Sequence, residues 1–463
     1  MGSKGLETAR AKMQDAGVDP VAIDTFAHYY RLLEHGETGM IPESSIDPLD
    51  MPALADVEVS DEAAAEAIRR TAVIKLNGGL GTSMGMDRAK SLLCVRRGLS
   101  FLDIIARQVL HLRKEYDATL PLIFMNSFRT SSDTMAALAR YQDLQVDGLP
   151  LEFLQNKVPK LLVSNLAPAS YPKNPDLEWC PPGHGDLYTA MRGTGLLGQL
   201  RDAGYRHVFV SNSDNLGAVA DARVAGWFAQ SGAPFAIEAV RRTSSDRKGG
   251  HFARRKADGR IVLRESAQTL DADKKALTDL DRHRFASTNN LWFDVQAMVE
   301  ALDTRGGILG LPLIRNVKNL DPTDPSTPEV IQIETAMGAA IEVFEGARTI
   351  EVGRERFVPV KTTDDLLVLR SDVYDLGKDF VLDQASDEVP YVSLDGGFYK
   401  LVGDFDKRFP EGAPSLREAD SFTVEGDWTF GPGVRVVGDV ALNASAAKRV
   451  ESGAVLGEQD ADG

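Results

Sequence analysis

Hydrophobic and polar positions alternate in a regular way through the middle of the chain. Five short runs of apolar, often β-branched residues predict buried strands, at 71–77, 121–127, 151–156, 207–214 and 234–240. Several of the stretches between these runs have helical spacing instead. Short buried strands that alternate with helices are typical of an α/β protein with a largely parallel sheet covered on both faces. Ligands bind beyond the carboxyl ends of such strands, so we expect functional residues directly after each strand.

The clearest helix signal follows Ser100. Ser100 and Asp103 have the spacing of a capping-box variant. A nearly apolar stripe then continues at helical spacing, and it consists of Phe101, Ile104, Ile105, Gln108, Val109 and Leu112. A further helix is expected near 133–142, behind the second strand. These helices are predicted to cover the sheet.

The two ends of the chain differ from this middle part. Residues 1–68 predict helices, interrupted by a loop with three prolines, and Ser60 is a plausible N-cap for DEAAAEAIRR. Near the C-terminus, apolar residues recur about every sixth position, at Val424, Phe430, Val436 and Leu442. This spacing is typical of a hexapeptide β-helix coil, although a small antiparallel sheet would also satisfy it. We therefore divide the chain into an N-terminal helical region (1–68), a catalytic domain (69–385) and a linker with a C-terminal β-helix-like domain (386–463).

Composition narrows the classes of function. The 463 residues carry a formal net charge of −16, so an interaction with nucleic acid is not expected. Cys94 and Cys180 lie beside apolar or aromatic residues without metal-ligand spacing, and we expect two buried free thiols. The N-terminal segment lacks the apolar core of a secretion signal, and no apolar run approaches the roughly 18 residues of a membrane helix. We expect a cytoplasmic protein that does not interact with membranes.

The strongest local signal is the glycine-rich segment LNGGLGTSMG (76–85), directly after the first predicted strand. Its four glycines remove side chains from one turn, so backbone N–H groups can approach phosphate oxygens. A Walker A loop is excluded because its terminal Gly-Lys-Ser is absent. The spacing Gly79-x-Gly81-x-x-x-Gly85 is close to the dinucleotide fingerprint, and Arg96 and Arg97 could meet a 2′-phosphate. In a dinucleotide-binding unit, however, the helix that follows the strand should begin within the glycine motif, whereas here the predicted helix comes after Ser100. A turn without a ligand is the third interpretation.

With Lys90-Ser91 close behind it, this loop resembles the nucleotide loop of the eukaryotic-type UTP–glucose-1-phosphate uridylyltransferase family. Other segments resemble the family in the family's order, between about 70 and 372: MNSFRT (125–130), FLQNKVPK (153–160), PPGHGDLY (181–188), FVSNSDNLGA (209–218), KGGH (248–251), STNNLWF (287–293), IQIETAMGAAI (331–341) and RFVPVKTTDDLL (356–367). The resemblance implies a mixed, mostly parallel, Rossmann-like sheet of the nucleotide-diphosphosugar-transferase type, and it agrees with a C-terminal β-helix. It also implies that UTP and α-D-glucose 1-phosphate give UDP-glucose and pyrophosphate.

That reaction brings two anions together, so we expect catalysis by charge neutralisation and in-line positioning. The resemblance makes Lys90 and Lys361 catalytic, with Lys361 on the α-phosphate. Without it, VPVKTTDD predicts only a strand and an exposed polar turn. Asp214 ends a predicted strand, where a carboxylate suits Mg²⁺ together with phosphate oxygens. Capping a helix that starts near Ala218 is its alternative role.

The remaining site residues are also implied by the resemblance. The nucleotide-binding set is Leu76, Asn77, Gly78, Gly79, Lys90, Gln155, Gly183, Asp214 and Lys361. The sugar-phosphate set is Gly78, Gly79, His184, Lys248, Asn289 and Glu334. The amide of Gln155 can donate and accept at once, as the uracil edge requires. A helix-start acid is an equally good account of Glu334.

Three alternative functions stay open at this point. Another acceptor such as galactose 1-phosphate differs from glucose 1-phosphate only in one hydroxyl orientation, which the sequence does not distinguish. The glycine spacing leaves an NAD(P)-dependent oxidoreductase, and a non-catalytic UDP-sugar-binding protein would use the same pocket. The C-terminal domain is also a candidate surface for homo-oligomer formation.

Overall fold

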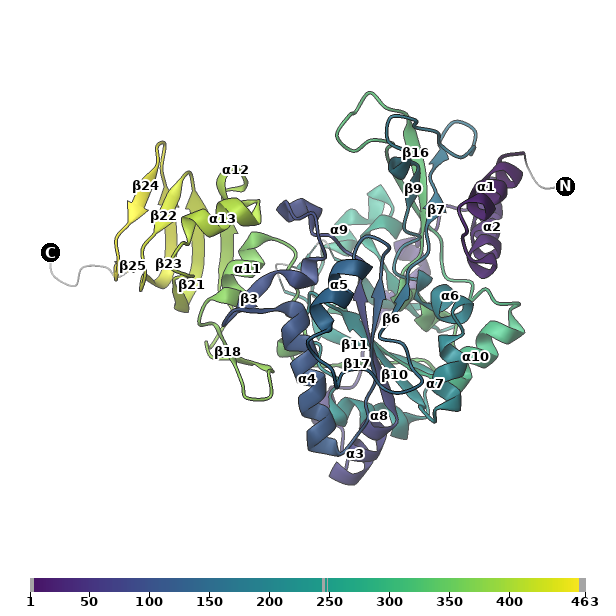
Figure 1. The fold of residues 1–463 in the computed structure, drawn as a ribbon, viewed down its shortest axis with the longest axis horizontal. Helices are drawn as coiled ribbons and strands as arrows, with labels where there is room; N and C mark the ends of the chain where they lie inside the picture. The colour runs from purple at the N-terminus through teal and green to yellow at the C-terminus, as the bar shows by residue number, and fades with distance from the viewer. Residues whose placement is uncertain (1–3, 244–245, 248, 458–463) are drawn as a thin grey trace.

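A computed structural model describes residues 4–243, 246–247 and 249–457 (Figure 1). At its centre lies a seven-stranded sheet in which β14 runs antiparallel to both neighbours and the other pairs are parallel. The strand order is β17 (Arg348–Glu351), β11 (Phe235–Arg241), β14 (Phe285–Asp294), β10 (His207–Asn212), β2 (Thr71–Asn77), β5 (Leu122–Asn126) and β6 (Glu152–Leu154). The mixed, mostly parallel sheet expected from the sequence is confirmed.

Two hydrophobic clusters cover the two faces of this sheet because alternate strand residues point to opposite sides. Val73 belongs to one cluster, whereas its neighbours Ala72 and Ile74 belong to the other. The first face packs against α3 (Asp61–Arg69), α4 (Phe101–Tyr116) and α8 (Ala222–Ser231). The second packs against α6 (Asp186–Gly193), α7 (Leu196–Asp202) and α10 (Val295–Thr304) (Figure 1). Because the helices cover the two faces of the sheet, the carboxyl ends of the parallel strands are occupied by loops.

Local signals in the sequence explain the main elements. The strand β2 occupies the predicted residues 71–77. In α4, the Ser100 side chain accepts the Asp103 N–H, and the Asp103 carboxylate accepts the Ser100 N–H, so the capping box is confirmed. Ser60 likewise caps α3. The helix α5 (Ser131–Leu138) lies behind β5, close to the predicted position.

Smaller sheets extend the catalytic body. One contains β1 (Ile46–Pro48), β12 (His251–Arg255) and β13 (Ile261–Arg264), and another contains β15 (Ile314–Asn319), β16 (Glu329–Glu334) and β8 (Leu161–Leu162). Three short antiparallel pairs complete it: β3 (Cys94–Arg96) with β4 (Leu99–Ser100), β7 (Val158–Pro159) with β9 (Trp179–Cys180), and β18 (Tyr374–Leu376) with β19 (Leu382–Gln384). The short helices α9 (Lys274–Leu277) and α11 (Thr363–Arg370) lie in the connecting segments.

The N-terminal region contains helices, as predicted, but part of its proline-rich loop is a strand. Helices α1 (Lys4–Asp15) and α2 (Pro20–Glu34) pack against residues of β7, β8 and β16. Residues 46–48 form β1, which pairs with β12. Burial of Ile46 against Ala253 and Val262 accounts for this pairing. Pro48 is tolerated there because β1 is an edge strand.

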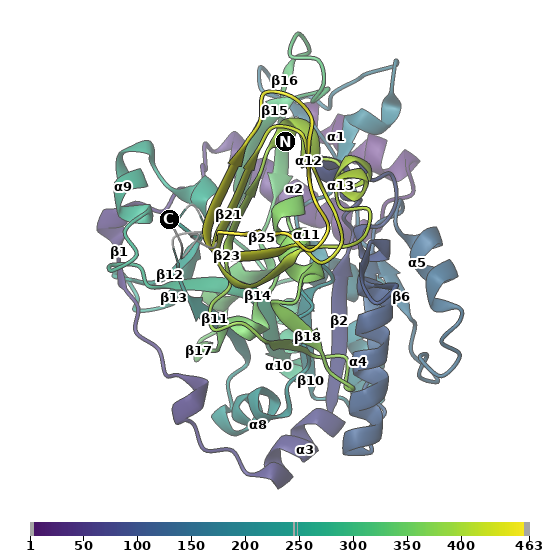
Figure 2. The ribbon, with the colours of Figure 1, turned by 90° about the vertical axis from the view of Figure 1, so that its left-hand side faces the viewer.

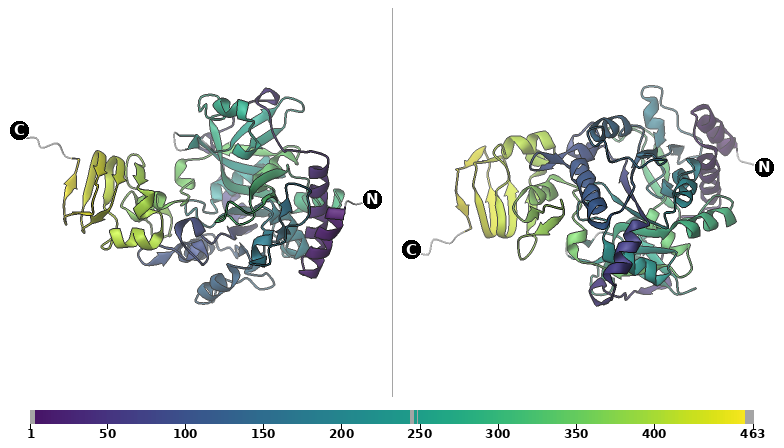
Figure 3. Two further views of the ribbon diagram at one scale, coloured as in Figure 1. Left: turned by 90° about the horizontal axis from the view of Figure 1, so that it is seen from above. Right: turned by 60° about the horizontal axis from the view of Figure 1, so that its bottom comes forward.

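The C-terminal part consists of parallel strands and two short helices. These are α12 (Gly396–Tyr399) and α13 (Val402–Arg408). One sheet has the order β20 (Tyr391–Leu394), β21 (Ser415–Glu425), β23 (Arg435–Asn443) and β25 (Val455–Leu456), and β22 (Trp428–Phe430) pairs with β24 (Lys448–Val450) (Figure 2). All of these pairs are parallel, which excludes the antiparallel alternative. These strands and the N-terminal helices lie at opposite ends of the molecule (Figure 3).

The expectation of two buried thiols is wrong for Cys94. Cys180 is buried, whereas Cys94 is exposed. The apolar neighbours misled the prediction because β3 is a short strand whose side chains alternate, with Val95 directed into the core. Among the described residues, no helix combines the length and the apolar character that crossing a membrane requires.

Candidate active site

The glycine-rich loop lies between the carboxyl end of β2 and the residues that precede β3. Gly81 and Gly85 have positive φ angles of 67° and 76°, which favour glycine. Gly78 is restricted in another way, since a Cβ there would lie 2.9 Å from Oε1 of Gln155. The loop is closed at its far end by a hydrogen bond of 3.0 Å from the Lys90 N–H to the Gly79 carbonyl. This closure brings Lys90 back beside the start of the loop.

Asn77 fixes the base of the loop with its side chain. Its Nδ2 donates to Oδ1 of Asn126 at 2.8 Å, and its Oδ1 accepts from Ser213 Oγ at 2.9 Å. The Leu76 carbonyl accepts the Ser213 N–H at 3.0 Å. Asn77 is 2% exposed, so the polar atoms of its side chain form hydrogen bonds within the protein. The ends of β2, β5 and β10 are thereby held together, and only main-chain atoms of Asn77 are left for a ligand.

Gln155, Gly183 and Glu334 lie together on one side of the loop. Nε2 of Gln155 donates to the Gly183 carbonyl at 3.0 Å. Gly183 has a φ of 76°, and a Cβ there would lie 2.4 Å from the Thr335 carbonyl oxygen and 3.2 Å from Cβ of Glu334. Oε1 of Glu334 accepts from Nδ2 of Asn316 at 3.0 Å. Glu334 ends the strand β16 and does not start a helix, so the alternative account as a helix-start acid is wrong.

His184 has a defined tautomer. The Met337 N–H donates to its Nδ1 at 3.0 Å, so Nδ1 must be unprotonated and Nε2 carries the proton. Burial lowers the pKa of His184 to about 4, and the ring is neutral at neutral pH. His184 therefore offers one N–H donor, from Nε2, next to Gly183.

The charged part of the site lies at the end of β10. Nζ of Lys90 is 2.8 Å from Oδ2 of Asp214 and also donates to the Val360 carbonyl. The Val360 N–H in turn donates to the Asp214 carbonyl at 3.1 Å. Asp214 lies in a turn before α8, whose N-cap is Asp221, so Asp214 does not cap that helix. The main chain at Val360 leads directly to Lys361.

A cavity of about 430 Å³ adjoins Asp214 and reaches one of the sugar-phosphate candidates. Its lining includes Asp214, Asn289 and Lys361. Asn289 has a φ of 59° within an irregular part of β14, a conformation that is rare outside glycine. Strained residues of this kind are concentrated at ligand sites. The predicted Lys248 lies outside the described residues.

Glu265 also lines this cavity, and the sequence interpretation missed it. Desolvation raises the pKa of its carboxyl group, and the Lys361 ammonium opposes that rise. Glu265 follows β13 directly, so the rule that functional residues come after strands applies to it. The strand itself was not predicted, because the apolar run in IVLRES is short and ends at Arg264.

The donors fit a divalent cation only in combination with a substrate. Among residues 4–243, 246–247 and 249–457 there is no group of three His, Cys, Asp or Glu side chains that could hold a metal ion. Asp214 offers carboxylate oxygens beside Lys90. Mg²⁺ is commonly held by one or two carboxylates, water and substrate phosphate oxygens, and Asp214 fits that mode.

Comparison with known proteins agrees with this geometry. The family described as UTP–glucose-1-phosphate uridylyltransferase matches residues 23–436. The chain is similar to the UTP–glucose-1-phosphate uridylyltransferase of Hordeum vulgare, with 36% identity over 397 residues that cover 84% of this chain and 81% of the relative. It is also similar to the probable enzyme of that name from Schizosaccharomyces pombe, with 35% identity, 84% of this chain and 76% of the relative.

Solved structures extend the similarity over nearly the whole chain. A single-residue mutant of UDP-glucose pyrophosphorylase from Leishmania major, in complex with UDP-glucose, superposes with a TM-score of 0.92 at 42% identity and 98% coverage of both chains. The UDP-glucose phosphorylase of Trypanosoma brucei gives a TM-score of 0.90 at 40% identity, again with 98% coverage of both chains. The glycine-rich loop, the paired Lys90 and Asp214 and this similarity lead to one conclusion: the chain belongs to the UTP–glucose-1-phosphate uridylyltransferase family.

Proposed function

We propose that this chain transfers the uridylyl group of UTP to α-D-glucose 1-phosphate and releases pyrophosphate, the reaction for which its family is named. The observation that carries the proposal is the cavity at the carboxyl end of β10, which Asp214 and Lys361 line, with Lys90 paired to Asp214. A sugar-phosphate oxygen attacks the α-phosphorus of UTP, the new P–O bond forms, and the bond to the leaving pyrophosphate breaks. No protein nucleophile is needed.

Two lysines neutralise the charge that gathers in this reaction. Lys361 is assigned to the α-phosphate, where charge develops in the transition state. Lys90 is assigned to the UTP phosphates, supported by its position at the closed end of the glycine-rich loop. Asp214 and the Val360 carbonyl accept two of the three N–H donors of its ammonium, so the third is left for a phosphate oxygen when UTP binds. The backbone N–H groups of Gly78 and Gly79 are the further phosphate contacts.

Asp214 is the proposed ligand of Mg²⁺. The ion supplies positive charge to the phosphate oxygens, which lowers the barrier to attack on the α-phosphorus. Asp214 holds its place through its own carbonyl, which accepts the Val360 N–H at 3.1 Å.

In this proposal the residues assigned to the uridine and those assigned to the sugar phosphate meet around Gly183. Gln155 pairs with the uracil edge, next to the main chain of Leu76, Asn77 and Gly183. His184 donates its Nε2 proton to the sugar phosphate, supported by its fixed tautomer. Hydroxyls of glucose contact Asn289 and Glu334, and Glu265 joins them because it lines the same cavity as Asn289. Lys248 remains a sequence-based candidate for the sugar phosphate.

The C-terminal strands form a left-handed β-helix-like domain in this proposal. Support comes from their parallel pairing, in which Val424 lies opposite Leu442, and from the burial of Val424, Phe430 and Val436. Self-association through this domain, the cytoplasmic location and the division at residues 68 and 385 stay predictions.

Pyrophosphate release from UTP and Mg²⁺ tests the proposal. Glucose 1-phosphate, galactose 1-phosphate and N-acetylglucosamine 1-phosphate are offered separately, and we expect release with glucose 1-phosphate alone. Release only with galactose 1-phosphate would keep the chemistry and replace the acceptor. No release with any sugar, together with a melting-temperature increase on adding UDP-glucose, would favour a non-catalytic UDP-sugar-binding protein. A melting-temperature increase on adding NADPH, without one on adding UTP, would instead support the oxidoreductase.

A further inference from the structure

The segment that carries Lys361 has little regular structure of its own. Residues 357–361 connect a short 3-10 turn (Arg354–Arg356) to α11 and make only an isolated bridge, between Pro359 and Asn215. Pro359 has no N–H, so only residues on either side of it can donate from the main chain toward the turn after β10. The position of Lys361 therefore depends on what holds those neighbours.

The side chain of Asn215 holds one side of the segment. Its Nδ2 donates to the Arg356 carbonyl at 3.1 Å, and its Oδ1 accepts the Val358 N–H at 2.9 Å. Asn215 is 1% exposed, so water does not compete for these bonds. The main chain of the preceding residue, Asp214, accepts the Val360 N–H at 3.1 Å. Two consecutive residues of one turn thus bind residues 356, 358 and 360.

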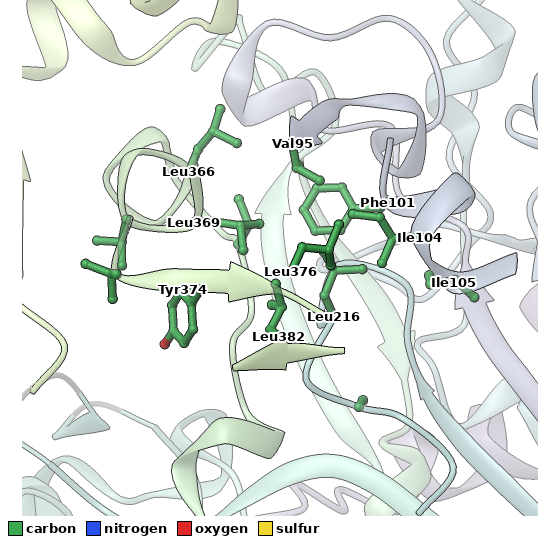
Figure 4. Close-up of a cluster of buried hydrophobic side chains, with 14 of the residues drawn as sticks. Val95, Phe101, Ile104, Ile105, Leu216, Leu366, Leu369, Tyr374, Leu376 and Leu382 are labelled. Atoms are coloured by element: carbon green, nitrogen blue, oxygen red, sulfur yellow. The ribbon is translucent and has the colours of Figure 1, made fainter. Parts of the chain in front are cut away.

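Both ends of this arrangement are fixed. On one side, Arg356 is paired with the fully buried Glu238 through two bonds of 2.6 and 2.7 Å. Its guanidinium also donates to the Val219 carbonyl at 3.0 Å, within the loop that follows Asn215. On the other side, Leu216 packs in one hydrophobic cluster with Leu366 and Leu369 of α11 (Figure 4). The side chain of Asn215 bridges the gap between these two anchors.

The turn that contains Asn215 does not need the amide for its own closure. The Asn215 N–H donates to the Asn212 carbonyl at 3.3 Å, and the Ala218 N–H donates to the Asn215 carbonyl at 3.3 Å. Below it, Nζ of Lys75 donates to the Ala218 carbonyl at 2.6 Å. Replacing the amide should therefore leave Asp214 in place and release the opposite segment.

We propose that Asn215 is a positioning residue: its amide sets the register of residues 356–360 and so holds Lys361 in the cavity beside Asp214. The inference rests on the proposed role of Lys361. Lys90 donates to the Val360 carbonyl of the same segment, but its contact with Asp214, which stays in place, keeps its ammonium at the end of the glycine-rich loop. A displacement of about 1 Å at a reacting group can cost about 100-fold in rate, whereas binding of UTP through the glycine-rich loop does not depend on this amide.

Two variants and one matched control test the proposal. Asn215→Ala removes both bonds, and Asn215→Leu removes them while filling the space, in case the smaller side chain prevents folding. The control is Asn319→Ala. Nδ2 of Asn319 also donates to main-chain carbonyls, those of Pro325 and Thr327, but Asn319 is the last residue of β15 and does not line the cavity. We expect kcat to fall about 100-fold in both Asn215 variants, the Kd of UTP to change less than about threefold, and the control to keep its kcat.

Hydrogen exchange of the free protein supplies a second readout that is independent of turnover. The amides of Val358 and Val360 should exchange faster in the Asn215 variants and unchanged in Asn319→Ala. Unchanged exchange at these amides, or faster exchange with an unchanged kcat, would overturn the proposal. An equal loss of kcat in Asn319→Ala would mean that the loss in the Asn215 variants is a general stability effect, and this would overturn the positioning role. If the unaltered protein releases no pyrophosphate with any sugar phosphate, the proposed function fails, and the exchange experiment alone decides whether Asn215 sets the segment.

Discussion

The ammonium of Lys90 lies 2.8 Å from a carboxylate oxygen of Asp214, with 14% and 25% of the two side chains exposed. Each residue is proposed to contact a different component of the bound complex, Lys90 a phosphate and Asp214 a cation. Without ligands, the opposite charges of the two partly buried side chains neutralise each other. Partly buried ion pairs contribute little net stability, so the contact can be exchanged for ligand contacts at small cost.

Asp214→Asn should weaken the dependence on Mg²⁺. The amide keeps the shape of the side chain but loses the negative charge that binds a hard cation. We expect the Mg²⁺ concentration for half-maximal pyrophosphate release to rise at least about tenfold, measured by titrating Mg²⁺ at fixed UTP. Excess chelator should stop the unaltered enzyme completely. Full activity in chelator, or the same Mg²⁺ curve for Asp214→Asn, would exclude this residue as the metal ligand.

Lys361→Ala should lower turnover far more than UTP affinity. The proposed partner of Lys361 is charge that arises in the transition state, so kcat should fall by about 100- to 1000-fold while the Kd of UTP changes little. Lys378→Ala, which removes an exposed lysine, is the control and should retain full turnover. A normal kcat for Lys361→Ala would remove this residue from the mechanism.

Gly183→Ala should destabilise the protein and raise the KM for UTP. The new Cβ would lie 2.4 Å from the Thr335 carbonyl oxygen. The alanine would also have to adopt a backbone φ of 76°. Backbone strain alone costs about 1–2 kcal/mol, and the clash adds to it. Gly204→Ala is the matched control, because Gly204 has a φ of 88° with nothing within 4 Å of an added Cβ. Urea unfolding should show a smaller loss for Gly204→Ala, and equal losses would mean that the contact with Thr335 is unimportant.

Stability should fall in mild acid through the buried histidines. Burial lowers the pKa of His184 to about 4, below the value of 6.5 in an unfolded chain. Between these values the unfolded chain binds more protons, so the folded state gains stability as pH rises to 6.5 and loses it as pH falls toward 4. The melting temperature should decrease across this range, and His184→Gln should flatten part of the decrease. An unchanged slope in the variant would show that His184 does not contribute.

Sequence patterns predicted the central sheet well because the information for it is local. The strand β2 consists of one continuous apolar run, and α4 carries both its cap and its apolar stripe. The strands β12 and β13 were not predicted, since their arginines interrupt the apolar pattern. Arg264, for example, is fully buried, and one of its partners is Glu43, which is far away in the sequence.

The site was predictable only as far as its motifs extend. The family segments contain Lys90, Asp214 and Lys361, but no pattern in them indicates that the first two form a pair. Asn215 is a clearer case. Its bonding partners lie 141 and 143 positions away, and its immediate neighbours, Asp214 and Leu216, do not reveal them. Interactions of this range depend on the folded backbone, so residue spacing carries no sign of them.

The pairing of β1 with β12 also limits how the protein can be shortened. A truncation at residue 68, where the amino-acid pattern changes, would remove the outer strand of the sheet whose last strand, β13, leads into Glu265. It would also remove Glu43, which accepts hydrogen bonds from Arg264 and Arg282, and leave the edge of β12 open to solvent. The N-terminal region (1–68) contributes no residue to the proposed chemistry, yet its strand β1 completes the sheet whose strand β13 leads into Glu265. We expect an enzyme without this region to lose affinity for glucose 1-phosphate before it loses affinity for UTP.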